Sequence, residues 1–319
     1  MISLKQLRYF EAVARAGHFG RAAEQCAVTQ PALSMQVQEL EHFLGLQLLE
    51  RGRGGVILTE GGKEIARRAS QVLADVRDIV DFARQQGGTL SGPLGFGVIP
   101  SVAPYILPQL LPTIRTAFPD LDLHIRETQT QLLLRELVDG RLDLLLLALP
   151  VEHPEVETAR LFEDRFLLAM PPSYQVSNRV HATPDLLEGD RLLLLEEGHC
   201  FRAQALAFCN RSGRPPRDLI EGGSLSTLVQ MVGAGIGVTL IPEMALALET
   251  RSATIDAARL PAPRPTRTVG MIWRATNPLA AQFLEVARLV REAAEAARER
   301  AGRERPVAMR LAGSERAPL

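Results

Sequence analysis

The chain has 319 residues, of which 46% are hydrophobic and 23% charged, and its 36 basic and 37 acidic side chains leave a formal charge of -1. That length exceeds what one compact core usually contains, so we expect two or three domains, and the balanced charge excludes a polybasic nucleic-acid coat or an acidic solvating tail. Three cysteines are too few for a disulfide scaffold, and we find neither a signal peptide nor an apolar run long enough to span a membrane. A soluble cytoplasmic protein is therefore expected.

The first fifty or so residues predict three helices. Apolar residues at three- and four-residue steps over 4–14 form one helical face, which stops at Gly17. A short helix over 21–26 follows, and a third opens at Thr29, with a proline in its first turn, and ends at Gly45. Two short helices joined by a tight turn have the layout of a helix-turn-helix.

The exposed side of the third helix favours contact with DNA. Amides and hydroxyls can pair with base edges and phosphate oxygens in a major groove, and this side carries Gln30, Ser34, Met35, Gln36 and Gln38. An ordinary surface helix is the alternative interpretation. Residues 49–59 predict a two-stranded wing, in which Arg51 and Arg53 stand beside two glycines and are suited to phosphate or minor-groove contact. We therefore predict a winged helix-turn-helix over residues 1–59.

This segment also carries a family pattern in which polar as well as apolar positions match. The matching positions are Ala22, Ala23, Thr29, Gln30, Pro31, Ala32, Leu33, Ser34, Gln36, Leu40, Glu41, Leu44, Gly45, Leu48 and Arg51. The pattern resembles the signature of the LysR-type transcriptional regulators, with Leu49 where the family usually has phenylalanine. The resemblance implies an oligomer that binds promoter DNA, a linker helix, and a sensing domain with the two-lobed fold of periplasmic binding proteins. The positions implied to contact DNA are Thr29, Gln30, Pro31, Ser34, Gln36, Arg51 and Arg53.

Residues 60–87 predict a linker and dimerisation helix. Steps of four and three, as in the seam of a coiled coil, connect Ile65, Ala69, Val72, Val76, Ile79 and Ala83. The seam could pack on its own domain, but the simplest partner is the same helix of a second chain, which supplies the twofold axis that half-site DNA recognition needs. Glycines and a proline within 87–93 indicate a hinge after the helix.

Residues 88–300 predict an α/β sensing domain. Strand-like and helical segments alternate along it, the strands at 95–100, 121–125, 142–149 and 165–170 and the helices at 105–118 and 131–140. This alternation is typical of a parallel sheet covered by helices. A late return of the chain predicts two lobes, about 92–162 with 268–300 and about 163–267, and a ligand cleft between them. The tail over 301–319 lacks a sustained apolar face and is expected to be disordered.

Cys200 and Cys209 are the candidates for chemistry. Their spacing matches no zinc site and the chain has no Cys-x-x-Cys pair, so we expect no metal and no cofactor. Both could be small buried hydrophobes. Cys200, however, follows His199 at a predicted helix start, with Arg202 close by, and a helix N-terminus, an imidazole and a guanidinium all favour the thiolate.

Helical geometry adds a constraint on the two cysteines. If they lie on one helix, about 13 Å of rise separates them, whereas a disulfide requires Cα atoms within roughly 7 Å. They cannot bridge while the helix stands, so oxidation to a disulfide would have to unwind residues 201–208 and disturb the packing of Phe201 and Phe208. A chemical event coupled to a bistable element is how a redox switch operates.

The sensing half extends the resemblance to the peroxide-sensing members of the LysR-type family. The matching positions are Ile99, Pro100, Pro104, Tyr105, Glu127, Thr128, Gln129, Thr130, Gly198, His199, Cys200, Phe201, Arg202, Cys209, Ser224, Leu225, Gly235, Ile236 and Gly237. The resemblance implies that Cys200 is the peroxidatic thiolate and that Cys209 resolves its sulfenic acid into an intramolecular disulfide. It also implies that His199 and Arg202 activate the thiolate, and that Ser101 and Thr130 hold the peroxide.

Two positions depart from the peroxide-sensing pattern. Ser101 stands where threonine is usual, which keeps the hydroxyl and removes a rigid methyl group. Ala203 stands where an aspartate commonly follows the arginine. If that carboxylate assists proton transfer or packing of the reduced state, we expect a slower response or a shifted threshold.

We interpret the chain as a hydrogen-peroxide-sensing activator of transcription and not as an enzyme. Its expected partners are double-stranded DNA, further copies of itself in a dimer or tetramer, RNA polymerase, and a thiol reductant of the glutaredoxin or thioredoxin type. One alternative is a metabolite sensor of the same family, with a small organic anion in the cleft and incidental cysteines. Another is a thiol peroxidase, which would leave the helix-turn-helix and the linker seam unexplained.

Overall fold

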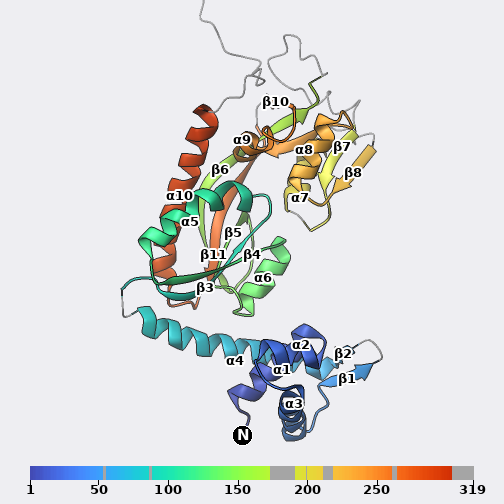
Figure 1. Ribbon diagram of the computed structural model, residues 1–319, viewed down its shortest axis with the longest axis vertical. Coiled ribbons are helices and arrows are strands. Elements are labelled where there is room, and N and C mark those ends of the chain that lie inside the picture. Colours follow the sequence, from blue (N-terminus) through green and yellow to red (C-terminus); the bar gives the residue numbers. More distant parts are fainter. Residues whose placement is uncertain are drawn as a thin grey trace, which may run out of the picture.

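The computed structural model describes residues 1–52, 55–85, 88–172, 191–198, 200–210, 218–260 and 264–303 (Figure 1). A small N-terminal unit and a larger α/β unit are connected by one long helix. The C-terminal helix extends to Arg303, and the tail beyond it lies outside the described residues.

The N-terminal unit is a winged helix-turn-helix, as predicted. Its elements are α1 (Leu4–Ala16), α2 (Phe19–Gln25), α3 (Gln30–Leu44), β1 (Leu49–Gly52) and β2 (Gly55–Leu58). Ser3 and Gln6 form a capping box at the start of α1, and Gly17 ends it in a left-handed conformation with φ of 60°. The second helix begins earlier than predicted, because His18 Nδ1 accepts a hydrogen bond from the backbone of Gly20.

Helix α4 (Glu60–Gln85) links the two units and contacts both of them. Near its start, Ala69 is buried in the core of the N-terminal unit. Further along, Ala74 packs against the turn at Gly140, where an added Cβ would lie 2.5 Å from the Ala74 Cβ. The predicted linker helix is therefore also a surface on which the C-terminal unit rests.

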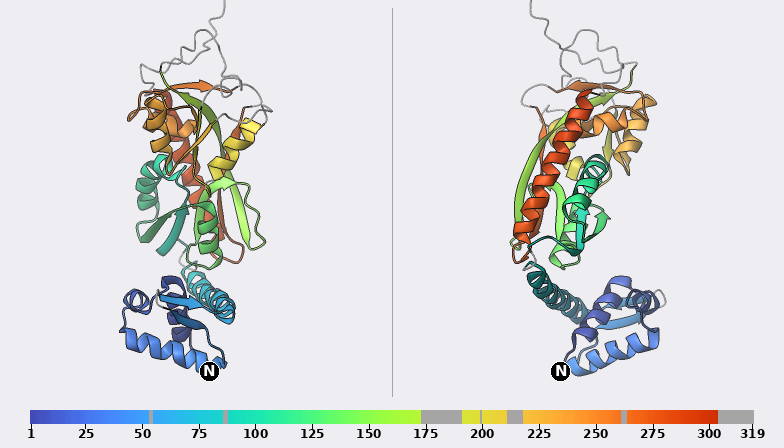
Figure 2. Two further views of the ribbon diagram at one scale, coloured as in Figure 1. Left: turned by 90° about the vertical axis from the view of Figure 1, so that its right-hand side faces the viewer. Right: turned by 60° about the vertical axis from the view of Figure 1, so that its left-hand side comes forward.

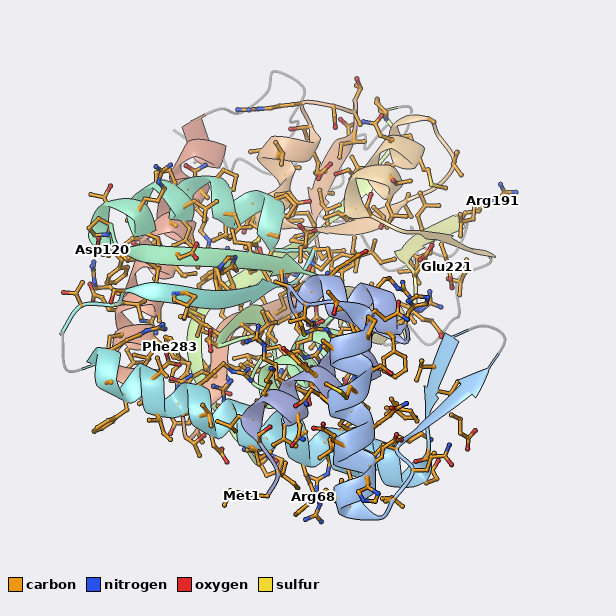
Figure 3. All side chains as sticks on the ribbon, turned by 60° about the horizontal axis from the view of Figure 1, so that its bottom comes forward. Met1, Arg68, Asp120, Arg191, Glu221 and Phe283 are labelled. Atoms are coloured by element: carbon orange, nitrogen blue, oxygen red, sulfur yellow. The ribbon has the colours of Figure 1, made fainter. Side chains whose placement is uncertain are left out.

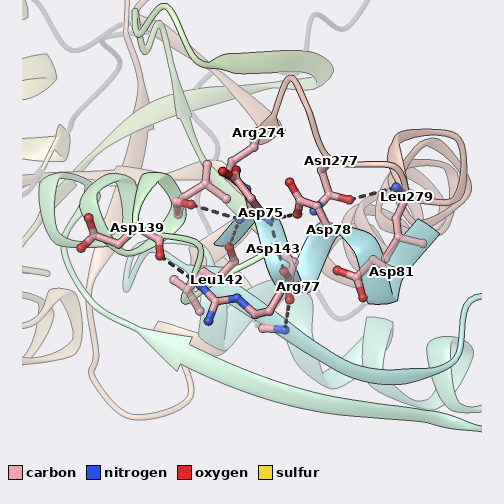
Figure 4. Close-up of polar contacts among 12 residues, drawn as sticks. Asp75, Arg77, Asp78, Asp81, Asp139, Leu142, Asp143, Arg274, Asn277 and Leu279 are labelled. Carbon is pink, nitrogen blue, oxygen red and sulfur yellow. Dashed lines mark hydrogen bonds and ion pairs between the residues drawn. The ribbon is translucent and has the colours of Figure 1, made fainter. Parts of the chain in front are cut away.

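A group of charged residues completes this junction (Figure 4). The Arg274 Nη2 donates to Asp78 Oδ1 of α4 over 2.9 Å, while Arg274 Nη1 donates to the carbonyls of Leu137 and Leu142. Arg77 of the same helix donates to the carbonyl of Asp139 over 3.2 Å. Because only 4% of the Arg274 side chain is exposed, this ion pair is protected from solvent screening.

The C-terminal unit is built on a seven-stranded sheet. Its strands, in the order β10-β6-β11-β5-β3-β4 with β9 paired to β6, are β3 (Gly92–Val98), β4 (Leu121–Glu127), β5 (Leu144–Leu149), β6 (Val156–Met170), β9 (Thr239–Pro242), β10 (Asp256–Arg259) and β11 (Thr266–Arg274). Strand β3 is parallel to β4 and β5, whereas β11 is antiparallel to β5 and β6. The sheet is thus mixed and not parallel throughout, because the chain returns along β11 beside the long strand β6.

We call β3 to β5, with α5 (Ala103–Ala117), α6 (Thr130–Val138) and α10 (Ala280–Arg303), the first lobe. The second lobe contains β7 (Arg191–Leu195), β8 (Asp218–Gly222), β9, β10, α7 (Cys200–Asn210), α8 (Leu225–Gly233) and α9 (Leu246–Glu249). Strands β7 and β8 pair in parallel, and the long strand β6 passes between the lobes with α10 along it (Figure 2). No helix among the described residues is long and apolar enough to cross a membrane.

Candidate peroxide site and DNA-binding face

Both cysteines of the predicted switch lie on helix α7, which begins at Cys200 and includes Cys209. The two cysteines therefore lie on one helix, as the geometric argument from the sequence required, and the helix separates their Cα atoms by about 13 Å along its axis. The side chains of both cysteines, and His199 as a whole, lie outside the described residues. As long as α7 is helical, the two sulfur atoms cannot be joined.

Helix α7 is held on the second lobe by its buried face. Phe201, directly after Cys200, is fully buried and packs edge-on against Phe166 of β6, with 5.3 Å between the ring centroids. Ala205, one turn later, is also buried. Unwinding α7 would therefore remove an aromatic side chain from the core.

The Arg202 side chain is bound to strand β7, on which α7 packs, and to strand β8. Its Nη1 donates to the carbonyl of Leu195 over 3.1 Å and pairs with Glu221 Oε1 at 2.6 Å. Glu221, labelled in Figure 3, lies on β8 opposite Leu194 of β7. Arg202 thus fixes the start of α7 to β7 and β8, and its side chain is only 16% exposed.

The other two predicted peroxide ligands lie at adjacent strand ends. Ser101 follows β3 and Thr130 follows β4, and because these two strands pair in parallel, their carboxyl ends lie side by side. Both residues are buried, with Ser101 3% and Thr130 9% exposed. Ser101 precedes α5 and Thr130 opens α6, so the partial positive charge of two helix N-termini is directed at this place.

An arginine that the sequence analysis missed positions Ser101. Arg267 of β11 donates from Nη1 to Ser101 Oγ over 2.7 Å and from Nη2 to the Ser101 carbonyl over 2.9 Å. Its Nε donates to Asp164 Oδ2 of β6 over 3.0 Å. Burial raises the pKa of Asp164, while the Arg267 guanidinium opposes that shift. Sequence spacing gives no signal for this group, because Arg267 lies far along the chain from both partners.

Both hydroxyls can form more hydrogen bonds than the described residues supply. The Ser101 oxygen accepts a hydrogen bond from Arg267, and its hydroxyl also carries a proton that it can donate to another group. Among the residues that the structure describes, the buried Thr130 Oγ1 has no hydrogen-bond partner. A buried polar atom of this kind normally has a partner, so the pair is suited to a small polar molecule that both donates and accepts hydrogen bonds.

One hydrogen bond joins this pair of strand ends to the cysteine helix. Gln129, which precedes Thr130, donates from Nε2 to the carbonyl of Glu197 over 3.1 Å. Glu197 lies in the turn between β7 and α7. Ser101, Thr130 and the start of α7 therefore meet in one region between the lobes.

The predicted DNA-contacting residues lie at the start of α3 and in the wing. Thr29, Gln30 and Pro31 are exposed, and Gln36 Nε2 donates to Glu39 on the same helix. Ser34 is half-buried within α3. Arg51 belongs to β1, although its side chain is not described, and Arg53 lies outside the described residues. The exposed first turn of α3 is the part of this unit suited to a DNA groove.

No group of three or more metal-ligating side chains occurs within the described ranges. Cys26, the remaining cysteine, is half-buried and packs against the core of the N-terminal unit.

Comparison with known proteins identifies both units. Residues 4–63 match the bacterial regulatory helix-turn-helix protein family of the LysR type, and residues 87–295 match the LysR substrate binding domain. The chain is 38% identical over 290 residues to the DNA-binding transcriptional dual regulator OxyR of Escherichia coli, covering 91% of this chain and 95% of the relative.

Two solved structures extend the comparison. A full-length OxyR variant from Pseudomonas aeruginosa matches with a TM-score of 0.76 at 36% identity, covering 91% of this chain and 95% of that one. A hydrogen-peroxide-bound OxyR mutant from Corynebacterium glutamicum matches with a TM-score of 0.67 at 32% identity and 98% coverage of both chains. The chain therefore belongs to the LysR family of helix-turn-helix transcriptional regulators, and within it to the group that contains OxyR.

Proposed function

We propose that this protein senses hydrogen peroxide and regulates the transcription of oxidative-stress genes. The observation that carries the proposal is the buried pair of Ser101 and Thr130 hydroxyls, which can form more hydrogen bonds than the described residues supply. The pair lies beside the start of the helix that Cys200 opens. Hydrogen peroxide is small, neutral, and both a donor and an acceptor. The peroxide-bound relative supports the same assignment.

The chemistry follows from the thiolate. The Cys200 sulfur attacks one peroxide oxygen, the O–O bond breaks, and the departing hydroxide takes a proton to leave as water. Cys200 becomes a sulfenic acid. The Cys209 thiol then attacks that sulfur, the S–S bond forms, and the sulfenic oxygen departs as a second water. Ser101 and Thr130 would orient the peroxide, and Arg202 and His199 would favour the thiolate.

The switch lies in helix α7. Because the disulfide cannot form across a standing helix, the second step requires residues between the cysteines to unwind. This removes Phe201 from its contact with Phe166, a change that the packed second lobe must accommodate. We propose that the resulting shift alters how the copies of the chain associate and hence how they contact DNA.

The remaining partners follow from this cycle. Each chain is oxidised once and must be reset by two electrons from an external dithiol of the glutaredoxin or thioredoxin type, so the protein is a sensor and not a turnover enzyme. It requires a compartment that keeps thiols reduced at rest, such as the cytoplasm. We propose that it binds operators as a dimer or tetramer and contacts RNA polymerase there.

A footprint comparison tests the proposal. The reduced full-length protein, bound to operator DNA, should change its protected region when peroxide is added, and Cys200→Ser should abolish the change. Cys26→Ser is the matched control, since that half-buried cysteine belongs to the N-terminal unit. A Cys200→Ser protein that still responds to peroxide would contradict the proposal.

A further inference from the structure

The turn that leads into α7 is held from two sides. From the second lobe, Arg202 binds the carbonyl of Leu195, and the backbone nitrogen of Glu196 donates to Gly222 of β8 over 3.2 Å. From the first lobe, the Gln129 amide donates to the carbonyl of Glu197. Because a carbonyl oxygen can only accept, it is the NH2 end of the Gln129 amide that faces it.

Packing makes the Gln129 contact specific. Gly198 adopts a φ of 92°, a backbone conformation that side chains disfavour, and a Cβ at this position would collide with the Gln129 amide. Glycine at position 198 therefore lets the end of the Gln129 side chain lie directly against the turn. The contact at Gly198 and the hydrogen bond to Glu197 together hold the backbone two and three residues before Cys200.

Gln129 also adjoins the proposed peroxide ligands. It precedes α6 as its N-cap residue, and Thr130 is the first residue of that helix. One side chain thus connects the backbone that carries the Thr130 hydroxyl to the backbone that carries Cys200. Thr130 and Cys200 come from different lobes, and this contact is a direct link between the two segments that carry them.

We propose that Gln129 is a positioning residue, which holds the start of α7 in register with the Ser101 and Thr130 hydroxyls so that a bound peroxide faces the Cys200 sulfur. This inference rests on the proposed function. It adds that the rate of the first oxidation depends on the contact that Gln129 makes between the two lobes. Gln129 itself exchanges no proton and makes no bond with sulfur.

Gln129→Met tests the role, since methionine keeps the length and neutrality of the side chain and removes the donor. Gln131→Met is the matched control, because Gln131 is exposed on the same helix. Two rates are measured for Cys200 in the reduced full-length protein: oxidation by hydrogen peroxide, and alkylation by iodoacetamide, which needs a thiolate but no bound peroxide. Gln129→Asn, whose amide is one carbon too short to reach, is a second variant should the first fold poorly.

We expect both Gln129 variants to lower the peroxide rate about tenfold, the effect of one lost hydrogen bond, while the iodoacetamide rate and the melting temperature stay close to those of the parent. The control should leave both rates unchanged. An unchanged peroxide rate, an equal loss in the control, or an equal loss with both reagents would overturn the inference. If the parent protein itself shows no rapid reaction of Cys200 with peroxide, it is the proposed function that fails.

Discussion

At the scale of single residues, the site combines groups that sequence patterns reveal with groups that only the fold brings together. Cys200, Ser101 and Thr130 stand in recognisable motifs. Arg267 and Asp164 do not, because their contacts with Ser101 and with each other span 166 and 103 positions of the chain. Such contacts depend on β6 and β11 running side by side, which the sequence analysis did not predict in detail.

Replacing Arg267 by lysine should slow the reaction of Cys200 with peroxide. A lysine keeps the charge beside Asp164 but cannot supply the planar fork that binds both the hydroxyl and the carbonyl of Ser101. We expect the oxidation rate to fall about tenfold. The rate is measured by alkylating the thiol that has not reacted and detecting it by mass spectrometry. Arg291→Lys, at an exposed arginine that donates to the Arg160 carbonyl, should have no effect. An equal rate in the two variants would contradict this role.

Asp143, beside the junction with α4, should make stability depend on pH. Burial raises its pKa above the ordinary value, although the Gly95 amide and Arg274 oppose the shift. Ionisation is therefore less favourable in the folded state. The stabilising contribution of the Asp143 carboxyl group is fully present below pH about 4 and is lost as the pH rises through its folded-state pKa.

Denaturant unfolding across pH 4 to 7 can isolate this contribution. The parent should lose stability as the pH rises through that window, so the free energy of unfolding of Asp143→Asn should increase relative to that of the parent. Asp75→Asn, at an exposed position of α4, should show no such trend. A difference between Asp143→Asn and the parent that is independent of pH would refute the assignment.

At the scale of elements, most ends of the helices could be predicted, because each is caused by residues close by in the sequence. Gly17 and Gly45 end helices in left-handed conformations, and the long periodic pattern after Thr59 forms α4. The direction of the sheet could not be read in this way. Apolar strands look alike whether they are parallel or antiparallel, so the late return of the chain was predicted but the antiparallel pairing of β11 with β5 and β6 was not.

Helix α7 should resist the second oxidation step by its own helical stability. Ala203 is exposed within it, so Ala203→Gly changes helix propensity with little effect on packing and should weaken the helix by about 1 kcal/mol. Conversion of the sulfenic acid to the disulfide should then accelerate about fivefold, as followed by quenched-flow mass spectrometry. Ala281→Gly, at an exposed site of α10, is the control. A disulfide that forms no faster in Ala203→Gly would argue against unwinding as the slow event.

At the scale of the whole molecule, α4 presents two different faces. At 100° per residue, Ile79 lies about 160° around the helix from Asp81. The side near Asp81 carries Ala74 and Asp78 and rests on the C-terminal unit, whereas Ile79 is 69% and Val72 39% exposed. One residue of the predicted seam, Ala69, is thus buried within its own chain, whereas Val72 and Ile79 are exposed and can contact a second copy.

Ile79→Glu should therefore weaken self-association and, through it, operator binding. A charge at the centre of an apolar interface between helices leaves a carboxylate buried without a partner. Sedimentation should show a shift toward monomer at micromolar concentration, while the melting temperature of the monomer is retained. Gln71→Glu, on the exposed polar surface of α4, should leave association unchanged. A fully associated Ile79→Glu protein would show that the seam is not the interface.

The central claim, that peroxide closes a bond between two cysteines of one helix, is tested most directly by titration. The reduced full-length protein is treated with increasing hydrogen peroxide, free thiols are alkylated, and disulfides are mapped by mass spectrometry. We predict a Cys200–Cys209 disulfide within one chain, complete near about one equivalent of peroxide, with Cys26 remaining reduced. Absence of that bond at full oxidation, or a bond to Cys26 or between chains in its place, would contradict the account.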